Sequence, residues 1–230
     1  MSVEVAAAGG TVAGGPAAVS SPLVARLLLL RHAESEWNAQ GRWQGQADTP
    51  LTERGRRHAA EAGPLLASFE MLVCSDLRRA RQTAEIIAAG AEIETIDTEP
   101  RLRERNAGPW QGLTRDEIER DWPGYLASGR RPDDYETDEQ LVVRADAALG
   151  HIALLADRRG TSEVLVITHG GVIHSLTVRA GLQPVPMPNL SGRRMSVEDG
   201  ALRVGEPVSV GDAEHHSSDA VEAGSPPPRP

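Results

Sequence analysis

The sequence contains no lysine, and all 24 of its basic residues are arginine. A lysine therefore cannot act as a Schiff-base nucleophile, and any fixed cation in a binding site must be an arginine or a histidine. Acidic residues outnumber basic ones and give a formal net charge of −9. This balance argues against non-specific nucleic-acid binding as the main function, so no nucleic-acid partner is expected.

Cysteine is almost absent as well. The single Cys74 excludes an internal disulfide and fits a reducing cytoplasm, which is the expected location. Cys74 follows Met-Leu-Val and is interpreted as a small buried residue rather than a nucleophile. No apolar run approaches the roughly 18 residues that a membrane-spanning helix needs. The first residues lack the basic start and apolar block of a secretory signal, so no membrane partner is expected.

The composition divides the chain into three parts. Residues 1–22 are rich in Ala, Gly, Ser and Val and predict a disordered leader. Residues 206–230 are polar, end in prolines and predict a disordered tail, in which His215 and His216 are interpreted as solvated residues rather than a metal-binding pair. Residues 23–205 remain as one folded domain.

Short apolar runs alternate with helical patterns inside this domain. Strands are predicted at 26–31, 71–75, 92–97 and 163–169. Residues 193–204 predict a further strand, a turn at Asp199–Gly200 and another short strand. Helices are predicted from Thr52, from Asp76 to a stop at Gly90, over 139–158, and after Gly170-Gly171. The alternation predicts an α/β fold, a three-layer α/β/α sandwich with a mostly parallel central sheet and helices on both faces.

Polar side chains follow the predicted strands at their carboxyl ends. The first strand runs into Arg31 and His32, the second into Ser75, and the fourth into His169. Glu104 lies in a loop after the third strand. Ligands of parallel sheets bind beyond the carboxyl ends of the strands, so these side chains are expected to share one pocket.

This set of side chains suits a phosphate monoester, which carries close to two negative charges. Arginine guanidinium groups bind phosphate oxygens in pairs, and helix N-termini add backbone N–H groups. An imidazole can attack phosphorus, and a carboxylic acid can protonate the leaving oxygen. Because side chains supply the positive charge, neither a metal nor another cofactor is expected. His169 and His174 are five residues apart and would not share a helix face, which disfavours a zinc site.

Five stretches together resemble the histidine phosphatase superfamily, the phosphoglycerate-mutase-like proteins. They are "LLLLRHAESEWN" (27–38), "GRWQGQADTPLTERG" (41–55), "CSDLRRARQTAEII" (74–87), "RLRERNAGPWQGLT" (101–114) and "VLVITHGGVI" (164–173). The resemblance implies phosphoryl transfer through a phosphohistidine at His32, with Glu104 as the acid and His169 as a donor to the phosphoryl group. It also implies that Arg79 is the second phosphate-binding arginine and that Arg78 and Arg81 are surface residues. Helix phase alone does not decide among the three.

The resemblance further implies which residues touch the substrate. These are Arg31, Asn38, Gln44, Gly45, Arg79, His169 and Gly170. His58 and His151 lie in polar helical stretches and are interpreted as surface residues. The family's frequent Gly-Glu-Ser before the penultimate helix is replaced by "YETDEQ" at 135–140. The segment 120–140 contains Arg130, Arg131, Trp122 and Tyr125, and is either a lid over the substrate or an ordinary surface.

Three functions remain open at this point. The first is a phosphomonoesterase acting on a small phosphorylated metabolite, the second a 2,3-bisphosphoglycerate-dependent phosphoglycerate mutase, and the third a non-catalytic phospho-ligand binder. Family mutases usually carry a longer insertion between the acid and the second histidine, and only 64 residues, 105–168, lie there in this chain. Hydrolysis is therefore favoured. The expected partner is a small-molecule phosphate monoester, and a homodimer is left open.

Overall fold

The computed structural model describes residues 24–211, so the predicted leader and residues 212–230 of the predicted tail lie outside the described residues. The strands are β1 (Val24–Arg31), β2 (Met71–Cys74), β3 (Ile96–Thr98), β4 (Glu163–Thr168), β5 (Ser191–Glu198) and β6 (Ala201–Ser209). The α-helices are α1 (Glu36–Ala39), α2 (Glu53–Ala62), α3 (Arg78–Ala91), α4 (Arg115–Asp121), α5 (Tyr125–Ser128), α6 (Asp138–Arg159) and α7 (Gly170–Arg179). Short 3-10 helices lie at η1 (Gly63–Leu66), η2 (Pro100–Leu102) and η3 (Gly108–Trp110).

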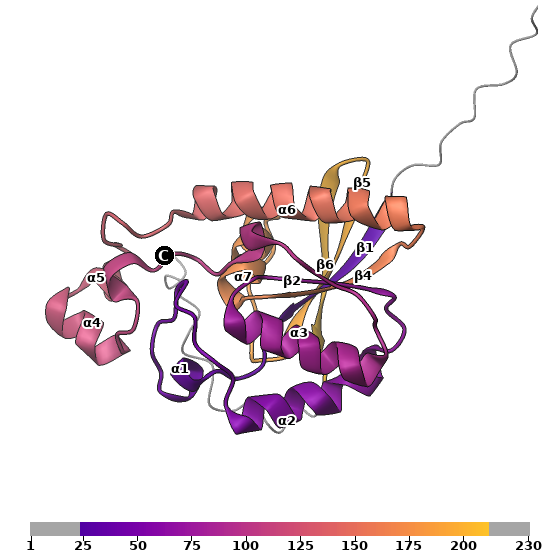
Figure 1. Ribbon diagram of the computed structural model, residues 1–230. Helices are drawn as coiled ribbons and strands as arrows, with labels where there is room; N and C mark the ends of the chain where they lie inside the picture. Colours follow the sequence, from indigo (N-terminus) through magenta and orange to yellow (C-terminus); the bar gives the residue numbers. More distant parts are fainter. Residues whose placement is uncertain (1–23, 212–230) are drawn as a thin grey trace, which may run out of the picture.

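The strands form a single sheet in the order β3-β2-β4-β1-β5-β6. The first four strands of this order are parallel, and β5 and β6 are added antiparallel beside β1. Helices α6 and α7 cover one face, and α2 and α3 cover the other (Figure 1). The predicted α/β/α sandwich with a mostly parallel sheet is confirmed.

The four leucines of β1 show why this strand is a rigid central element. Leu27 and Leu29 pack against α6 and α7, whereas Leu28 and Leu30 pack toward α2 and α3. All four are buried, because alternate side chains of a strand point to opposite faces and both faces are covered. Each such side chain contributes roughly 1.5–3 kcal/mol relative to an exposed position. The burial fixes the register of β1 and therefore the position of the residues that follow it.

Several predicted boundaries are wrong in detail. The third strand is Ile96–Thr98 rather than 92–97, and the second helix begins at Arg78 rather than Asp76. Gly90 does not stop that helix, which continues to Ala91. A Cβ on Gly63 would lie 2.8 Å from the Cα of Gly90, so the two glycines allow η1 and α3 to pack closely.

The C-terminal boundary also needs correction. Strand β6 continues through the predicted limit at 205–206 to Ser209, and the following Val210 is buried in the core. The turn predicted at Asp199–Gly200 is confirmed, with positive φ angles of 50° and 79°. Residues 206–211 therefore belong to the folded domain.

Aromatic side chains gather where α4 and α5 extend away from the sheet (Figure 1). Trp110 is fully buried there, and the side chains of Trp43, Trp122, Tyr125 and Tyr135 pack around it. Neighbouring rings meet edge to face, which is a favoured arrangement of aromatic pairs. This aromatic cluster attaches the α4–α5 segment to the rest of the domain.

Two further observations concern predictions made from composition. Cys74 is fully buried in β2, and burial raises the pKa of its thiol to about 12, as expected for an inert core residue. Within residues 24–211, no helix combines the length and the apolar character that crossing a membrane requires.

Candidate active site

Two histidines stand side by side at the carboxyl edge of the sheet because β1 and β4 are paired in register. Arg31 lies opposite Thr168, and the backbone N–H of His32 donates to Thr168 O at 2.9 Å. His32 and His169 are the next residues of the two strands. Their ring centroids are 5.2 Å apart and the rings meet edge to face. This separation is close to the roughly 4.7–4.9 Å between neighbouring strands, so the sheet itself sets it.

The ring of His32 is fixed at both nitrogens. Nδ1 lies 2.7 Å from the carbonyl oxygen of Ala33, which requires Nδ1 to carry the proton and donate. Nε2 then has a free lone pair, and it accepts from Nε of Arg79 at 3.1 Å. Burial, together with the charges of Arg79 and Arg31, holds the pKa of His32 well below its usual range, against a small opposing effect of the Ala33 bond. His32 is therefore a neutral imidazole with its lone pair at Nε2.

Arg79 is fully buried and its other donors are also used. Its Nη1 and Nη2 groups donate to the carbonyl oxygens of Ala47 and Gly45. The loop that provides these carbonyls is attached to α3 by Asp48, whose carboxylate accepts from the Arg78 N–H at 2.5 Å. Arg78 and Arg81 are exposed, as the resemblance implied and helix phase did not decide.

His169 is held by a serine from the neighbouring strand end. Its Nε2 lies 2.9 Å from Oγ of Ser75, and Ser75 Oγ also accepts from the Leu77 N–H. If the serine hydroxyl donates to Nε2, the proton of His169 is on Nδ1. Nδ1 is buried and has no hydrogen-bond partner within residues 24–211. Burial and the charge of Arg79 lower the pKa of His169 well below its usual range. The ring is thus neutral, and in the Nδ1–H tautomer it offers a donor to an anion.

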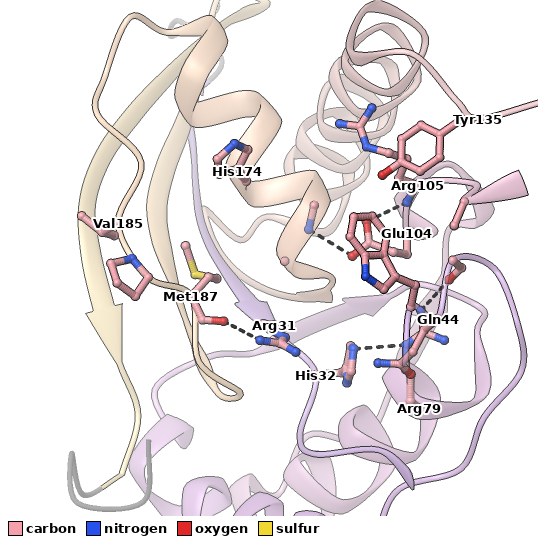
Figure 2. Close-up of a pocket in the computed structure, with 16 residues that line it drawn as sticks. Arg31, His32, Gln44, Arg79, Glu104, Arg105, Tyr135, His174, Val185 and Met187 are labelled. Atoms are coloured by element: carbon pink, nitrogen blue, oxygen red, sulfur yellow. Dashed lines mark hydrogen bonds between the residues drawn. The ribbon is translucent and has the colours of Figure 1, made fainter. Parts of the chain in front are cut away.

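Glu104 lies across the pocket from His32 (Figure 2). Its Oε2 accepts from the N–H of Gly171 in the first turn of α7 at 3.0 Å, and its Oε1 accepts from the Arg105 N–H at 2.6 Å. A Cβ on Gly171 would overlap Glu104 Oε1, so only glycine allows the carboxyl group this position. The N-terminus of α7 therefore binds the Glu104 carboxyl group, whereas phosphate was the ligand expected at a helix N-terminus from the sequence.

A single pocket contains most of the predicted site residues. Its lining includes Arg31, His32, Gln44, Gly45, Arg79, Glu104 and Gly170. His169 lies behind this surface in contact with His32. Gln44 uses Oε1 to accept from Ser35 and Thr49, which leaves its Nε2 as the donor for a ligand.

Asn38 has a different position from the one predicted. It is buried, and its Oδ1 accepts from the backbone N–H of Ser35 as half of a capping box on α1. The amide of Asn189 lies 3.4 Å from the same oxygen and donates to the carbonyl of His32 at 2.8 Å. Asn38 thus supports the backbone at His32 and does not line the pocket formed by the described residues.

The outer pocket contains residues that the sequence reasoning did not assign to the site. They are Trp43, Arg105, Ala107, Tyr135, Gly171, His174, Val185, Pro186 and Met187. Trp43 and Tyr135 belong to the aromatic cluster, whereas 185–187 lie in the loop before β5 (Figure 2). These side chains come from five separate segments, and no local pattern in any one segment signals a shared wall. Trp122 and Tyr125, suggested for a lid, pack within the aromatic cluster.

Other acidic and histidine side chains are engaged elsewhere. Glu34 is buried and pairs with Arg54 and Thr52, while His151, an exposed residue as expected, bonds to Glu99. His58 is half-buried rather than fully exposed. Among residues 24–211, no group of three His, Cys, Asp or Glu side chains is arranged to hold a metal ion.

Comparisons with known proteins agree with this geometry. The family model of the histidine phosphatase superfamily (branch 1) matches residues 27–204. A glucosyl-3-phosphoglycerate phosphatase of Mycolicibacterium vanbaalenii is 36% identical over 178 residues, covering 72% of this chain and 77% of the relative. A metal-independent phosphoserine phosphatase of Arabidopsis thaliana is 33% identical over 163 residues, 68% of each chain.

A solved structure extends the comparison to the fold. The crystal structure of phosphoglycerate mutase from Bacillus anthracis is 26% identical and covers 88% of this chain and 97% of its own, with a TM-score of 0.70. The match of the family model over most of the described residues, together with the paired histidines and their arginines, shows that this chain belongs to the histidine phosphatase superfamily.

Proposed function

We propose that this chain hydrolyses the phosphate monoester of a small metabolite through a phosphohistidine at His32. The observation that carries the proposal is the fixed orientation of His32, whose Nδ1–H is bound by Ala33 O while the lone pair of Nε2 remains available beside Arg79. A neutral, immobile imidazole next to two arginines is a suitable nucleophile for phosphorus.

The reaction follows in two displacement steps. In the first, Nε2 of His32 forms a bond to phosphorus as the ester P–O bond breaks, and Glu104 transfers its proton to the departing alkoxide. In the second, water attacks phosphorus, the P–N bond breaks, and Glu104 accepts the proton from water. Inorganic phosphate and the alcohol are the products. Arg31, Arg79 and the Nδ1–H of His169 stabilise the charge on the phosphoryl oxygens in both steps, so no metal is required.

Glu104 must enter the first step as a carboxylic acid. A phosphate monoester that binds as the monoanion can bring the necessary proton with it. The proton can then pass from the bound phosphate group to Glu104 before the ester bond breaks. Protonation of the leaving oxygen matters most for an alkoxide, which is a poor leaving group.

The substrate is proposed from the relatives and from the outer pocket. Two relatives are named for glucosyl-3-phosphoglycerate and phosphoserine, which are both phosphate esters of alcohols that carry further polar groups. The wall of Trp43 and Tyr135 opposite 185–187 gives room for an alcohol larger than the phosphate group. A mutase remains the second candidate because of the Bacillus anthracis structure. The short segment between Glu104 and His169 favours hydrolysis. A cytoplasmic location is proposed from the single buried cysteine.

The test compares two leaving groups. Glu104→Gln should lower turnover of an alkyl phosphate by about 10² or more, and of p-nitrophenyl phosphate far less, because nitrophenolate leaves without a proton. His32→Ala should abolish both activities and the acid-labile phosphoenzyme trapped with labelled substrate. Equal slowing of both substrates by Glu104→Gln would contradict the assignment of the acid.

The class of reaction is tested separately. Hydrolysis should release inorganic phosphate from a panel of metabolite phosphates and persist in excess EDTA. Interconversion of 3- and 2-phosphoglycerate only when 2,3-bisphosphoglycerate is added would instead identify a mutase.

A further inference from the structure

Arg144, in the second turn of α6, uses its whole guanidinium group to hold the loop that carries Glu104. Nε and Nη2 donate to the two carboxylate oxygens of Glu136 at 2.6 and 2.8 Å. Nη1 donates to the carbonyl oxygens of Arg101 and Arg103 at 2.7 and 2.6 Å. Nη2 also donates to the carbonyl oxygen of Glu104 itself at 3.0 Å. These five bonds account for all five N–H donors of an arginine.

Glu136 extends the same contact along the loop. Its Oε2 also accepts from the N–H of Asn106 at 3.0 Å. Burial raises the pKa of Glu136, but its bonds to Arg144 and to Asn106 outweigh that effect and leave the pKa below its usual range. The ionised pair therefore spans residues 101–106, with only 19% and 12% of the two side chains exposed.

The fixed backbone has a direct consequence for the Glu104 carboxyl group. Its position also depends on two backbone donors, Gly171 N–H and Arg105 N–H, and a second side chain, Gln46, donates to the Glu104 carbonyl at 3.1 Å. A movement of the backbone of about 1 Å would take the carboxyl group away from the leaving oxygen, and misplacement of this size can cost about 10²-fold in rate.

We propose that Arg144 is a positioning residue that, together with Glu136, places Glu104 for proton transfer to the leaving group. Neither residue lines the pocket formed by residues 24–211, so both act through the loop and not on the substrate. The inference rests on the proposed role of Glu104 as the acid. A lysine could not replace Arg144. Its three donors share one nitrogen and cannot reach both the Glu136 carboxylate and the three backbone carbonyl groups.

The test uses the dependence of rate on the leaving group, which a general loss of stability would not change. Arg144→Met keeps a side chain of similar reach without its donors, and Arg144→Lys keeps the charge without the fork. Both should lower alkyl phosphate turnover about ten- to a hundred-fold and p-nitrophenyl phosphate turnover less than threefold. Glu136→Gln should show the same selectivity. In a Glu104→Gln background, Arg144→Met should add less than about twofold, because residues that act through one group are not additive.

Arg159→Met is the matched control, since Arg159 forms a similar forked pair with Asp97 at the opposite end of α6. It should leave both rates unchanged. Equal slowing of both substrates by the Arg144 variants, or full additivity with Glu104→Gln, would overturn the proposal. So would unfolding of both Arg144→Lys and Glu136→Gln in circular dichroism, because the pair would then support the whole domain. If Glu104→Gln itself shows no selectivity, the proposed acid has failed, independently of Arg144.

Discussion

The Nε–H group of Arg79 points at Nε2 of His32, with 3.1 Å between the two nitrogens. The contact keeps Nε2 free of its own proton, because that nitrogen must accept. It also places a cation beside the atom that the proposed reaction joins to phosphorus. A phosphoryl oxygen that approaches His32 would therefore meet Arg79 in the same place.

Arg79→Lys tests how much of this arrangement depends on the guanidinium fork. Lysine retains the charge but cannot contact His32, Ala47 O and Gly45 O at once, so kcat/KM should fall by about 10² or more. Arg81→Lys on the exposed face of the same helix is the control and should change kcat/KM little. Similar losses in the two variants, measured by steady-state kinetics, would show that the effect is not specific to the contacts of Arg79 with His32 and the two carbonyl groups.

Stability should depend on pH through the buried histidines. Burial and neighbouring arginines hold the pKa values of His32 and His169 well below 6.5, and burial also lowers that of His174. Below about pH 6.5 the unfolded chain therefore binds protons that the folded chain does not, and the free energy of unfolding should fall as pH decreases.

The size of this effect is bounded by the number of histidines. Each one contributes at most about 1.4 kcal/mol per pH unit between its folded pKa and 6.5. Urea unfolding at several values from about pH 5 to 7.5 measures the slope, above the range in which carboxyl groups titrate. His169→Asn should make the slope shallower. An unchanged slope would mean that His169 is protonated in the folded state.

Gly171→Ala should disturb Glu104 while leaving the residues proposed to bind phosphate in place. The added Cβ would overlap the Glu104 carboxyl group, whereas a Cβ on Gly170 would lie 3.5 Å from Arg31 Cδ, an ordinary contact. Gly171→Ala is therefore expected to slow an alkyl phosphate about tenfold or more relative to p-nitrophenyl phosphate. Gly170→Ala should show no such preference between leaving groups. A preference of the same size in both variants would point to a general change at the start of α7.

The melting temperatures of two truncated chains should show which C-terminal residues stabilise the fold. A chain of residues 24–211 should keep its melting temperature, because it retains all of β6 and the buried Val210. A chain ending at residue 205 loses the β6 residues opposite Ser191–Arg193, together with Val210, and should melt several degrees lower. Equal melting temperatures would indicate that the end of β6 contributes little to the fold.

Much of the fold, and the proximity of His32, Arg79 and His169, could be predicted from the sequence. The leucine run of β1 and the "EVLVIT" run of β4 signal buried strands locally, and each ends in a histidine. Since both signals are local and parallel strands bring their ends together, His32 and His169 could be placed side by side at the carboxyl edge of the sheet before the structure was known. The motif resemblance then selected Arg79 from three neighbouring arginines.

Other features depend on contacts that are distant in the sequence. Trp43, Tyr135 and Met187 form one pocket wall, yet they come from loops that only the tertiary fold brings together. The end of α3 was misplaced because a glycine that permits close helix packing looks the same in sequence as one that ends a helix. The capping role of Asn38 could not be recognised, because a capping side chain and a ligand-binding one share the same chemistry.

The paired register of β1 and β4 fixes the two histidines independently of the loops that form the outer pocket. The two histidines are mounted on paired strands, and Arg79 on the first turn of α3, so their spacing does not depend on the length or composition of the outer loops. The wall of the outer pocket is built from those loops. Replacement of the side chains of Trp43, Tyr135 or Met187 can thus change which ester is accepted. Insertions beside them would disturb the reactive centre, because Gly45 O accepts from Arg79, Glu136 pairs with Arg144, and Met187 O accepts from Arg31. An engineer could exchange these wall side chains between relatives to alter substrate preference, while the paired strands keep the two histidines in place.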